Sequence, residues 1–144
     1  NKIKALFLNM GSKSIYENEE EISSDILIVK SLGILPTLYA DAQLAFVGGS
    51  LVNRGGHNII EPAIAQCPFI LGENYFNFKS IVESFISAKA THIVKTPLDI
   101  FEVFCKTYKN QDNFREGMIR NANTVVEKNI GATMRQLSLI RDSL

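Results

Sequence analysis

Residues 46–63, FVGGSLVNRGGHNIIEPA, gather residue types that bind anions. The glycine pairs Gly48-Gly49 and Gly55-Gly56 let the backbone turn sharply and bring its amides close to a ligand, because glycine has no Cβ. Arg54 can pair with an anion through its planar guanidinium, and His57 can donate to an anion or a sugar hydroxyl. This chemistry suits a phosphate or a carboxylate.

A helix is expected to begin directly after these glycines. Proline is tolerated only in the first turn of a helix, so Pro62 places that start between Asn58 and Pro62. The free N–H groups and the dipole at such a start attract anions. Asn58 and Glu61 also match the spacing of a capping box, which gives them a second, purely structural interpretation.

Each of these features has an ordinary structural interpretation as well. Paired glycines form tight loops, and a single arginine or histidine in a loop is commonly a surface residue. Their concentration at one strand-to-helix junction favours a binding site, since ligands of open α/β sheets bind at the carboxyl ends of the strands. The pattern matches neither G-x-G-x-x-G nor the P-loop G-x-x-x-x-G-K-[ST].

A second polar segment, GENYFNFKSI at residues 72–81, follows another expected strand. Asn77 stands just before a helix, where it either caps that helix or faces the same crevice as the glycine loop. Phe76 and Phe78 are expected to anchor the segment in the core. His92 begins a buried strand and is expected to be structural.

Short apolar runs alternate with helical periodicities along the chain, and this alternation predicts an α/β doubly wound fold with a parallel sheet and helices on both faces. Strands are expected at residues 4–9, 26–29, 44–47, 69–71 and 92–94. The first strand is followed by a loop through the acidic run at residues 17–21. Helices are expected at residues 35–42, 59–66, from 80 onward, and from 97 nearly to the end, with Gly131 separating a last helix at 133–144.

Composition places the chain among ordinary globular proteins and excludes several partners. It has 144 residues, enough for one domain with a core, and 15 basic residues balance 15 acidic ones, so no global charge indicates a nucleic-acid partner. No apolar run reaches the ~18 residues that a membrane span needs. Its start on Asn1, without a signal-peptide pattern, suggests an excised piece.

The two cysteines are far apart in the sequence and have no metal-type spacing. Cys105 falls on an apolar helical stripe with Phe101, Phe104 and Tyr108. Both Cys67 and Cys105 are therefore expected to be buried, reduced thiols of a cytosolic protein.

The motifs around the glycine loop resemble one known family, the 3-deoxy-D-manno-octulosonic acid (Kdo) transferases of lipopolysaccharide synthesis. The likeness covers residues 26–94 and is specific in the core Gly-Gly-His-Asn-x-x-Glu-Pro. The matching elements are Gly48-Gly49-Ser50, Arg54-Gly55-Gly56-His57-Asn58, Glu61-Pro62-Ala63 and Asn77-Phe78. They correspond to the C-terminal half of the family.

The resemblance implies a GT-B glycosyltransferase whose Rossmann-like C-terminal domain, here residues 1–144 as a single domain, binds the sugar-nucleotide donor. The family transfers Kdo from CMP-Kdo to lipid A precursors with inversion at the anomeric carbon, and the donor domain needs no metal or other cofactor. By position, Glu61 would face the ribose, and the glycine turns would hold the phosphate and the Kdo carboxylate. The implied donor-binding set is Gly48, Gly49, Ser50, Arg54, Gly55, Gly56, His57, Asn58, Glu61 and Asn77.

The chain departs from the family pattern in two places. Family members commonly carry Asp-Thr-x-Gly-Glu-Leu before this motif, whereas Lys30 and Ile34 stand here at the two acidic positions. Where the family often has Gly-Pro, this chain has Gly72-Glu73. These changes bear on the details of donor binding.

The N-terminal half of the family, with its acceptor site, carboxylate general base and membrane-associating segment, cannot be placed on these residues. The fragment alone is therefore expected to be soluble and inactive, and the full-length enzyme to work at the cytoplasmic face of the bacterial inner membrane. Two alternatives stay open: another GT-B enzyme, such as a UDP-sugar transferase or epimerase, and a non-catalytic module of the same fold.

Overall fold

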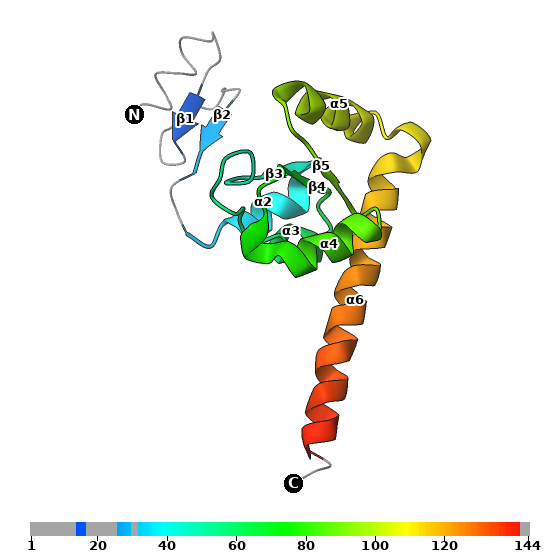
Figure 1. The fold of residues 1–144 in the computed structure, drawn as a ribbon. Helices are drawn as coiled ribbons and strands as arrows, with labels where there is room; N and C mark the ends of the chain where they lie inside the picture. Colours follow the sequence, from blue (N-terminus) through cyan, green and yellow to red (C-terminus); the bar gives the residue numbers. More distant parts are fainter. Residues whose placement is uncertain (1–13, 17–25, 30–31, 142–144) are drawn as a thin grey trace. The chain divides into compact units, whose positions relative to one another are not determined.

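A computed structural model describes residues 14–16, 26–29 and 32–141. The chain divides into two compact units, Asn1–Ile34 and Leu35–Leu144 (Figure 1). In the first unit, β1 (Ser14–Tyr16) pairs in parallel with β2 (Ile26–Ile28). The prediction of a strand at 26–29 is confirmed. The loop expected at 14–16 is wrong, because a partner strand, twelve residues downstream in register, supplies backbone hydrogen bonds that local sequence does not reveal. The strand predicted at 4–9 and the acidic run at 17–21 lie outside the described residues.

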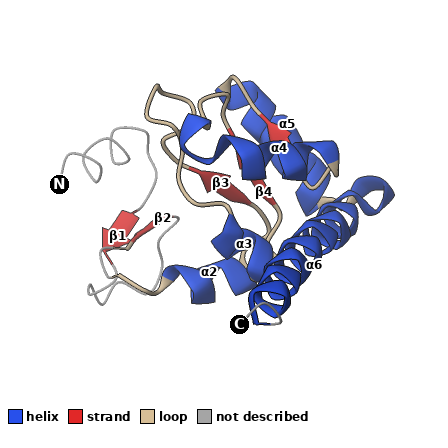
Figure 2. Cartoon of the chain, turned by 60° about the horizontal axis from the view of Figure 1, so that its bottom comes forward, coloured by secondary structure: helices blue, strands red, loops and turns tan. Residues whose placement is uncertain are grey.

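The second unit contains a parallel sheet in the order β3-β4-β5. Its strands are β3 (Ala45–Val47), β4 (Phe69–Leu71) and β5 (Thr91–Ile93), and Figure 2 shows β3 and β4 side by side. In register, Ala45 lies opposite Phe69, and Phe69 opposite Thr91. All three residues of β4 are buried, as expected for a central strand covered on both faces.

Helices cover both faces of this sheet, so the doubly wound prediction is confirmed. On one face, Phe69 and Leu71 pack with residues of α3, α4 and α6, and on the other, Ile70 packs with residues of α5 and the start of α6. On the first face, the rings of Phe69 and Phe85 pack edge to face, with their centroids 5.4 Å apart. The helical segments are α2 (Leu35–Asp41), α3 (Ile60–Ile64), η1 (Phe76–Phe78), α4 (Lys79–Ser87), α5 (Pro97–Tyr108), η2 (Gln111–Asn113) and α6 (Phe114–Arg141).

The helix boundaries differ from the predicted ones at three places. The helix expected from 97 onward is divided at residues 109–113, where Asn110 and Asp112 have left-handed φ values of 45° and 53°. α3 ends at Ile64, soon followed by Gln66 with a φ of 56°, so it is shorter than the helix predicted at 59–66. α6 runs for 28 residues without a break at Gly131. One glycine costs a helix only about 1 kcal/mol, which its helical neighbours can offset.

The orientation of α5 also differs from the predicted one. Ile100 and Val103 pack against the core, while Phe101, Phe104 and Tyr108 are exposed. Cys105 is consequently half-buried, whereas Cys67 is buried as predicted. Two apolar stripes lie next to each other on this helix, and periodicity does not say which one faces the sheet.

Across the described parts of the chain, no helix is both long and apolar enough to cross a membrane.

The structure predicts that Gly117→Ala stabilises the protein. Gly117 lies inside α6, and a Cβ added there meets no atom within 4 Å. Alanine loses less conformational entropy than glycine in a helix, so the free energy of unfolding should rise by about 0.5–1 kcal/mol. Urea unfolding measures this change, and a lower free energy of unfolding would contradict the described helix.

His92 predicts a pH dependence of stability. Its ring stacks on Phe114 with centroids 5.1 Å apart, and burial, with a smaller effect of Lys106, lowers its pKa. The unfolded chain therefore takes up a proton at His92 more readily than the folded one, and stability falls as pH drops below about 6.5. Between pH 7 and 5, the thermal midpoint should fall less for His92→Gln than for the parent. His57→Gln is the control, and an unchanged slope in His92→Gln would contradict this role.

Candidate functional site

The loops that follow the three parallel strands meet at one edge of the sheet. Residues 48–58 follow β3, residues 72–78 follow β4, and residues 94–96 follow β5. Because the strands are parallel and in register, their carboxyl ends lie at the same edge, where open α/β sheets bind ligands. The structure thus brings together the two polar segments that the sequence singled out.

Ser50 ties the first two loops together from inside the protein. Its side chain is fully buried, and its hydroxyl donates to the Val47 carbonyl at 2.5 Å and accepts from the Gly72 amide at 2.8 Å. Its carbonyl accepts from the backbone and side-chain amides of Asn74 at 2.9 and 3.2 Å. A Cβ on Gly72 would overlap the Ser50 carbonyl, so only glycine fits there.

Asn77 makes a second connection, nearer the surface. Its side-chain amide donates to the Arg54 carbonyl at 3.0 Å, and its backbone amide donates to the Gly55 carbonyl at 3.2 Å. It does not cap α4, whose first turn has no side-chain cap. Of the two interpretations left open for Asn77, the helix cap is wrong, and the side chain lies against the glycine loop.

The two phenylalanines beside Asn77 behave differently from each other. Phe78 packs against the core, as predicted. Phe76 is exposed, so its predicted anchoring role is wrong. The two phenylalanines are the first and last residues of the 3₁₀ turn η1, which points their rings in different directions.

The two glycine pairs face each other across the loop. Gly49 and Gly56 have φ values of 71° and 73°, and the Gly56 amide donates to the Gly49 carbonyl at 3.1 Å. The exposed His57 ring lies against Gly48 and Gly49, where a Cβ on Gly49 would stand 3.4 Å from Nε2. The glycines thus let the backbone double back and make room for the imidazole.

The start of α3 is held by Asn58 and Glu61, although not by the usual capping box. Asn58 Oδ1 accepts from the Ile60 amide at 3.0 Å, and its side-chain amide donates to Glu61 at 3.4 Å. Pro62 lies in the first turn, as predicted. α3 has five residues, so its dipole is weaker than that of the longer helix expected from the sequence.

The ionisable side chains of the site are exposed, and the charged ones among them carry both signs. Arg54, His57 and Glu61 all face solvent. At the neighbouring strand ends, Lys95 and Glu73 form an ion pair with Nζ and Oε1 2.7 Å apart, which raises the pKa of Lys95. Glu73, one of the departures from the family pattern, is therefore engaged within the protein.

The third loop is fixed by the start of α5. Asp99 accepts from the Lys95 and Thr96 amides at 2.8 and 3.0 Å, and the Asp99 amide donates to the Thr96 hydroxyl at 3.2 Å. These hydrogen bonds to the carboxylate lower the pKa of Asp99. This capping box keeps the end of β5 in place beside the other two loops.

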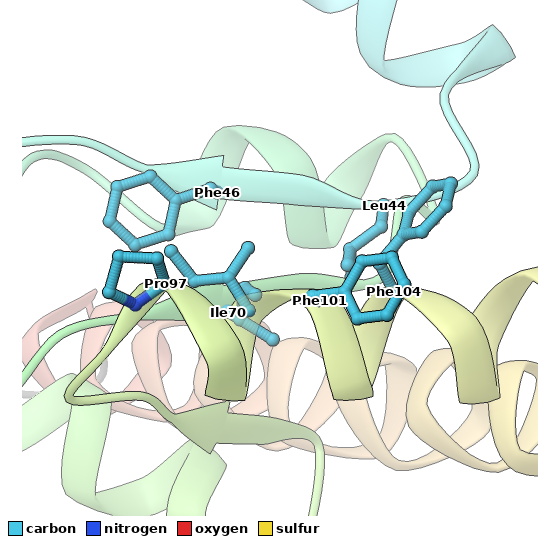
Figure 3. Close-up of a pocket in the computed structure, with 7 residues that line it drawn as sticks. Leu44, Phe46, Ile70, Pro97, Phe101 and Phe104 are labelled. Atoms are coloured by element: carbon cyan, nitrogen blue, oxygen red, sulfur yellow. The ribbon is translucent and has the colours of Figure 1, made fainter.

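A separate apolar groove of about 300 Å³ lies between α5 and the sheet (Figure 3). The groove has no side chain that can bind a phosphate. Sequence periodicity did not reveal the groove, because Phe101 and Phe104 of α5 were expected to be buried in the core. The lining residues are Leu44, Phe46, Ile70, Pro97, Ile100, Phe101 and Phe104.

Metal-binding clusters are lacking from the described residues: no three His, Cys, Asp or Glu side chains gather closely enough to hold an ion. Cys67 and Cys105 are free thiols, and burial raises the pKa of Cys67. Besides the Lys95–Glu73 ion pair, the glycine loop and the start of α3 offer backbone amides, the Arg54 guanidinium, the His57 imidazole, the Glu61 carboxylate and the Asn58 side-chain amide.

The sequence of the chain is similar to those of 3-deoxy-D-manno-octulosonic acid transferases. No protein-family model matches the chain. It is 32% identical to the 3-deoxy-D-manno-octulosonic acid transferase of Haemophilus influenzae over 85% of the chain and 29% of that protein. It is 31% identical to the enzyme of the same name from Bordetella pertussis over 99% of the chain and 33% of that protein. The chain thus spans about a third of the length of these relatives.

A solved structure is similar as well. The crystal structure of the C-terminal CMP-Kdo binding domain of WaaA from Acinetobacter baumannii superposes with a TM-score of 0.79 at 28% identity, covering 87% of this chain and 66% of that one. The resemblance inferred from the glycine-loop motifs is therefore confirmed in sequence and in fold.

The contact between Gly72 and Ser50 predicts a large effect of Gly72→Ala. The added Cβ meets backbone rather than a flexible side chain, so a loop must shift and the hydroxyl bridge must loosen. The free energy of unfolding should fall by about 3 kcal/mol or more in urea denaturation. Gly117→Ala is the matched control, and a change within about 0.5 kcal/mol for Gly72→Ala would contradict the described contact.

Proposed function

Because this chain is a homologue of the Kdo transferases, we propose that it is the donor-binding domain of a glycosyltransferase that moves Kdo from CMP-Kdo to a lipid A precursor. The observation that carries the proposal is the shared fold with a CMP-Kdo binding domain, at a TM-score of 0.79. The glycine loop and its polar neighbours at the carboxyl edge of the sheet support it independently.

The chemistry of the donor fits the groups at this edge. CMP-Kdo presents two anions, a phosphate and a sugar carboxylate, and the edge presents loop amides together with the exposed Arg54 and His57. Fixed N–H donors and a guanidinium stabilise the negative charge that grows on the departing phosphate. Since the loop backbone is already held by Ser50 and Asn77, its amides need little reorganisation during the reaction.

The proposed roles follow from position and exposure. The turn of Gly48 and Gly49 and the loop from Arg54 to Asn58 hold the phosphate and the carboxylate. Glu61, exposed beside Asn58, accepts hydrogen bonds from the ribose hydroxyls. Ser50 and Asn77 belong to the same site. Ser50 serves it through the backbone that its buried hydroxyl holds.

The complete reaction needs groups outside this domain. We place the acceptor site and the carboxylate general base of an inverting transfer on the part of the longer relatives that this chain does not span. On this basis the domain alone binds the donor without transferring it, and it uses neither metal nor other cofactor. The lipid acceptor places the full-length enzyme at the cytoplasmic face of the inner membrane.

Calorimetric titration with CMP tests this proposal. The parent should bind CMP saturably and prefer it to UMP. Arg54→Ala should weaken binding about ten- to hundredfold, because it removes a charge-assisted hydrogen bond to the phosphate. Glu61→Ala should weaken it about tenfold through the lost ribose contacts.

Substitutions on α6 provide the matched controls. Arg120 and Glu127 are exposed like Arg54 and Glu61, so Arg120→Ala and Glu127→Ala should leave CMP affinity unchanged. Failure of the folded parent to bind CMP would refute the proposal. A preference for UMP would point instead to a UDP-sugar enzyme of the same fold.

A further inference from the structure

Two connections hold the glycine loop against the loop after β4, and they differ in their surroundings. The Ser50 connection is fully buried, so its loss affects folding as well as the site. The Asn77 connection is exposed and lies at the rim of the same edge. Asn77 can therefore be altered without opening the core.

Asn77 holds two consecutive peptide groups of the glycine loop. Its side-chain amide donates to the Arg54 carbonyl, and its backbone amide donates to the Gly55 carbonyl. Its amide group also occupies the space where a Cβ of Gly55 would lie, and Gly55 has a φ of 81°. The backbone that carries Arg54 is thus shaped around Asn77.

The segment that carries Asn77 is anchored in the core. Its neighbours Tyr75 and Phe78 pack against the main core, and α4 begins directly after η1. Next to Gly55, the Gly56 amide donates to the Gly49 carbonyl. The position of Gly55 therefore also affects the position of the first glycine pair. Asn77 therefore connects the core to the second glycine pair, and the Gly56–Gly49 hydrogen bond extends this connection to the first.

We propose that Asn77 is a positioning residue for the donor site: through the Arg54 carbonyl and Gly55, it holds the loop of residues 54–58 in the conformation that receives the donor's anions. This inference rests on the proposed function, which it extends by assigning Asn77 an indirect role. Asn77 supports the loop through its amide and does not itself contact the donor.

Amide hydrogen exchange without ligand tests the connection itself. In Asn77→Ala, exchange at the Gly56 amide should accelerate about three- to tenfold, the factor expected for one lost hydrogen bond. Asn77→Asp, which keeps the size but replaces the donor with an acceptor, should do the same. Asn121→Ala is the matched control, because Asn121 likewise donates from its side chain to one backbone carbonyl, that of Lys89 at 3.2 Å. Unchanged exchange at Gly56 in both Asn77 variants would overturn the proposal.

A double-mutant cycle on CMP affinity separates positioning from direct contact. Asn77→Ala should weaken CMP binding about three- to tenfold while its thermal midpoint changes no more than that of Asn121→Ala. Gly55→Ala should weaken binding more, because its methyl group collides with the Asn77 amide. In the Asn77→Ala background this collision is gone, so Gly55→Ala should reduce CMP affinity by a smaller factor than it does in the parent.

The outcomes distinguish this inference from the function on which it rests. If the factors by which the two single substitutions reduce CMP affinity simply multiply in the double variant, Asn77 contacts the donor directly. That result would overturn its positioning role. If the parent binds no CMP while Gly56 exchange accelerates as expected, the proposed function fails and the connection through Asn77 stands.

Discussion

The site depends on one buried hydroxyl, that of Ser50. It joins the end of β3, through the Val47 carbonyl, to the beginning of the loop after β4, through the Gly72 amide. The two loops can approach this closely only because Gly72 has no Cβ. A buried polar group that is fully hydrogen-bonded costs little and specifies one arrangement, whereas an unsatisfied one costs about 1–3 kcal/mol. The geometry of the glycine loop is thus secured from the interior of the protein.

This buried support leaves the other polar side chains of the candidate site at the surface. Gly55 and Gly56 are buried, while Arg54, His57, Asn58 and Glu61, their neighbours along the chain, are exposed. A loop of this kind presents charged groups to solvent from a backbone that cannot easily move. Such preorganisation is what electrostatic stabilisation of a leaving phosphate requires, because the donors need not be reoriented as charge develops.

Much of the fold could be predicted from local sequence. The runs at residues 44–47 and 69–71 correspond to β3 and β4, and the alternation of strands and helices indicated the doubly wound sheet. One error arose where tertiary packing chose between local alternatives, and another where a single glycine was expected to end a helix. On α5, Ile100 packs against the core while Phe101 stays exposed at the apolar groove, and α6 continues through Gly131. On α5, two apolar stripes are alternatives of similar energy and packing chooses between them. On α6, the helical neighbours of Gly131 offset the cost of about 1 kcal/mol that one glycine brings.

The sequence by itself determined where the site is and what chemistry it offers. Paired glycines followed by Asn58, Glu61 and Pro62 mark a strand-to-helix junction whose residue types suit anions, and the same motifs pointed to the family. Only the tertiary structure decided which residues support that junction and which face solvent. Ser50 meets Gly72 and Asn77 meets Arg54 across more than twenty residues of sequence, and no periodicity encodes such pairs. They form because parallel strands in register bring their carboxyl ends to one edge, where the following loops must fit against each other.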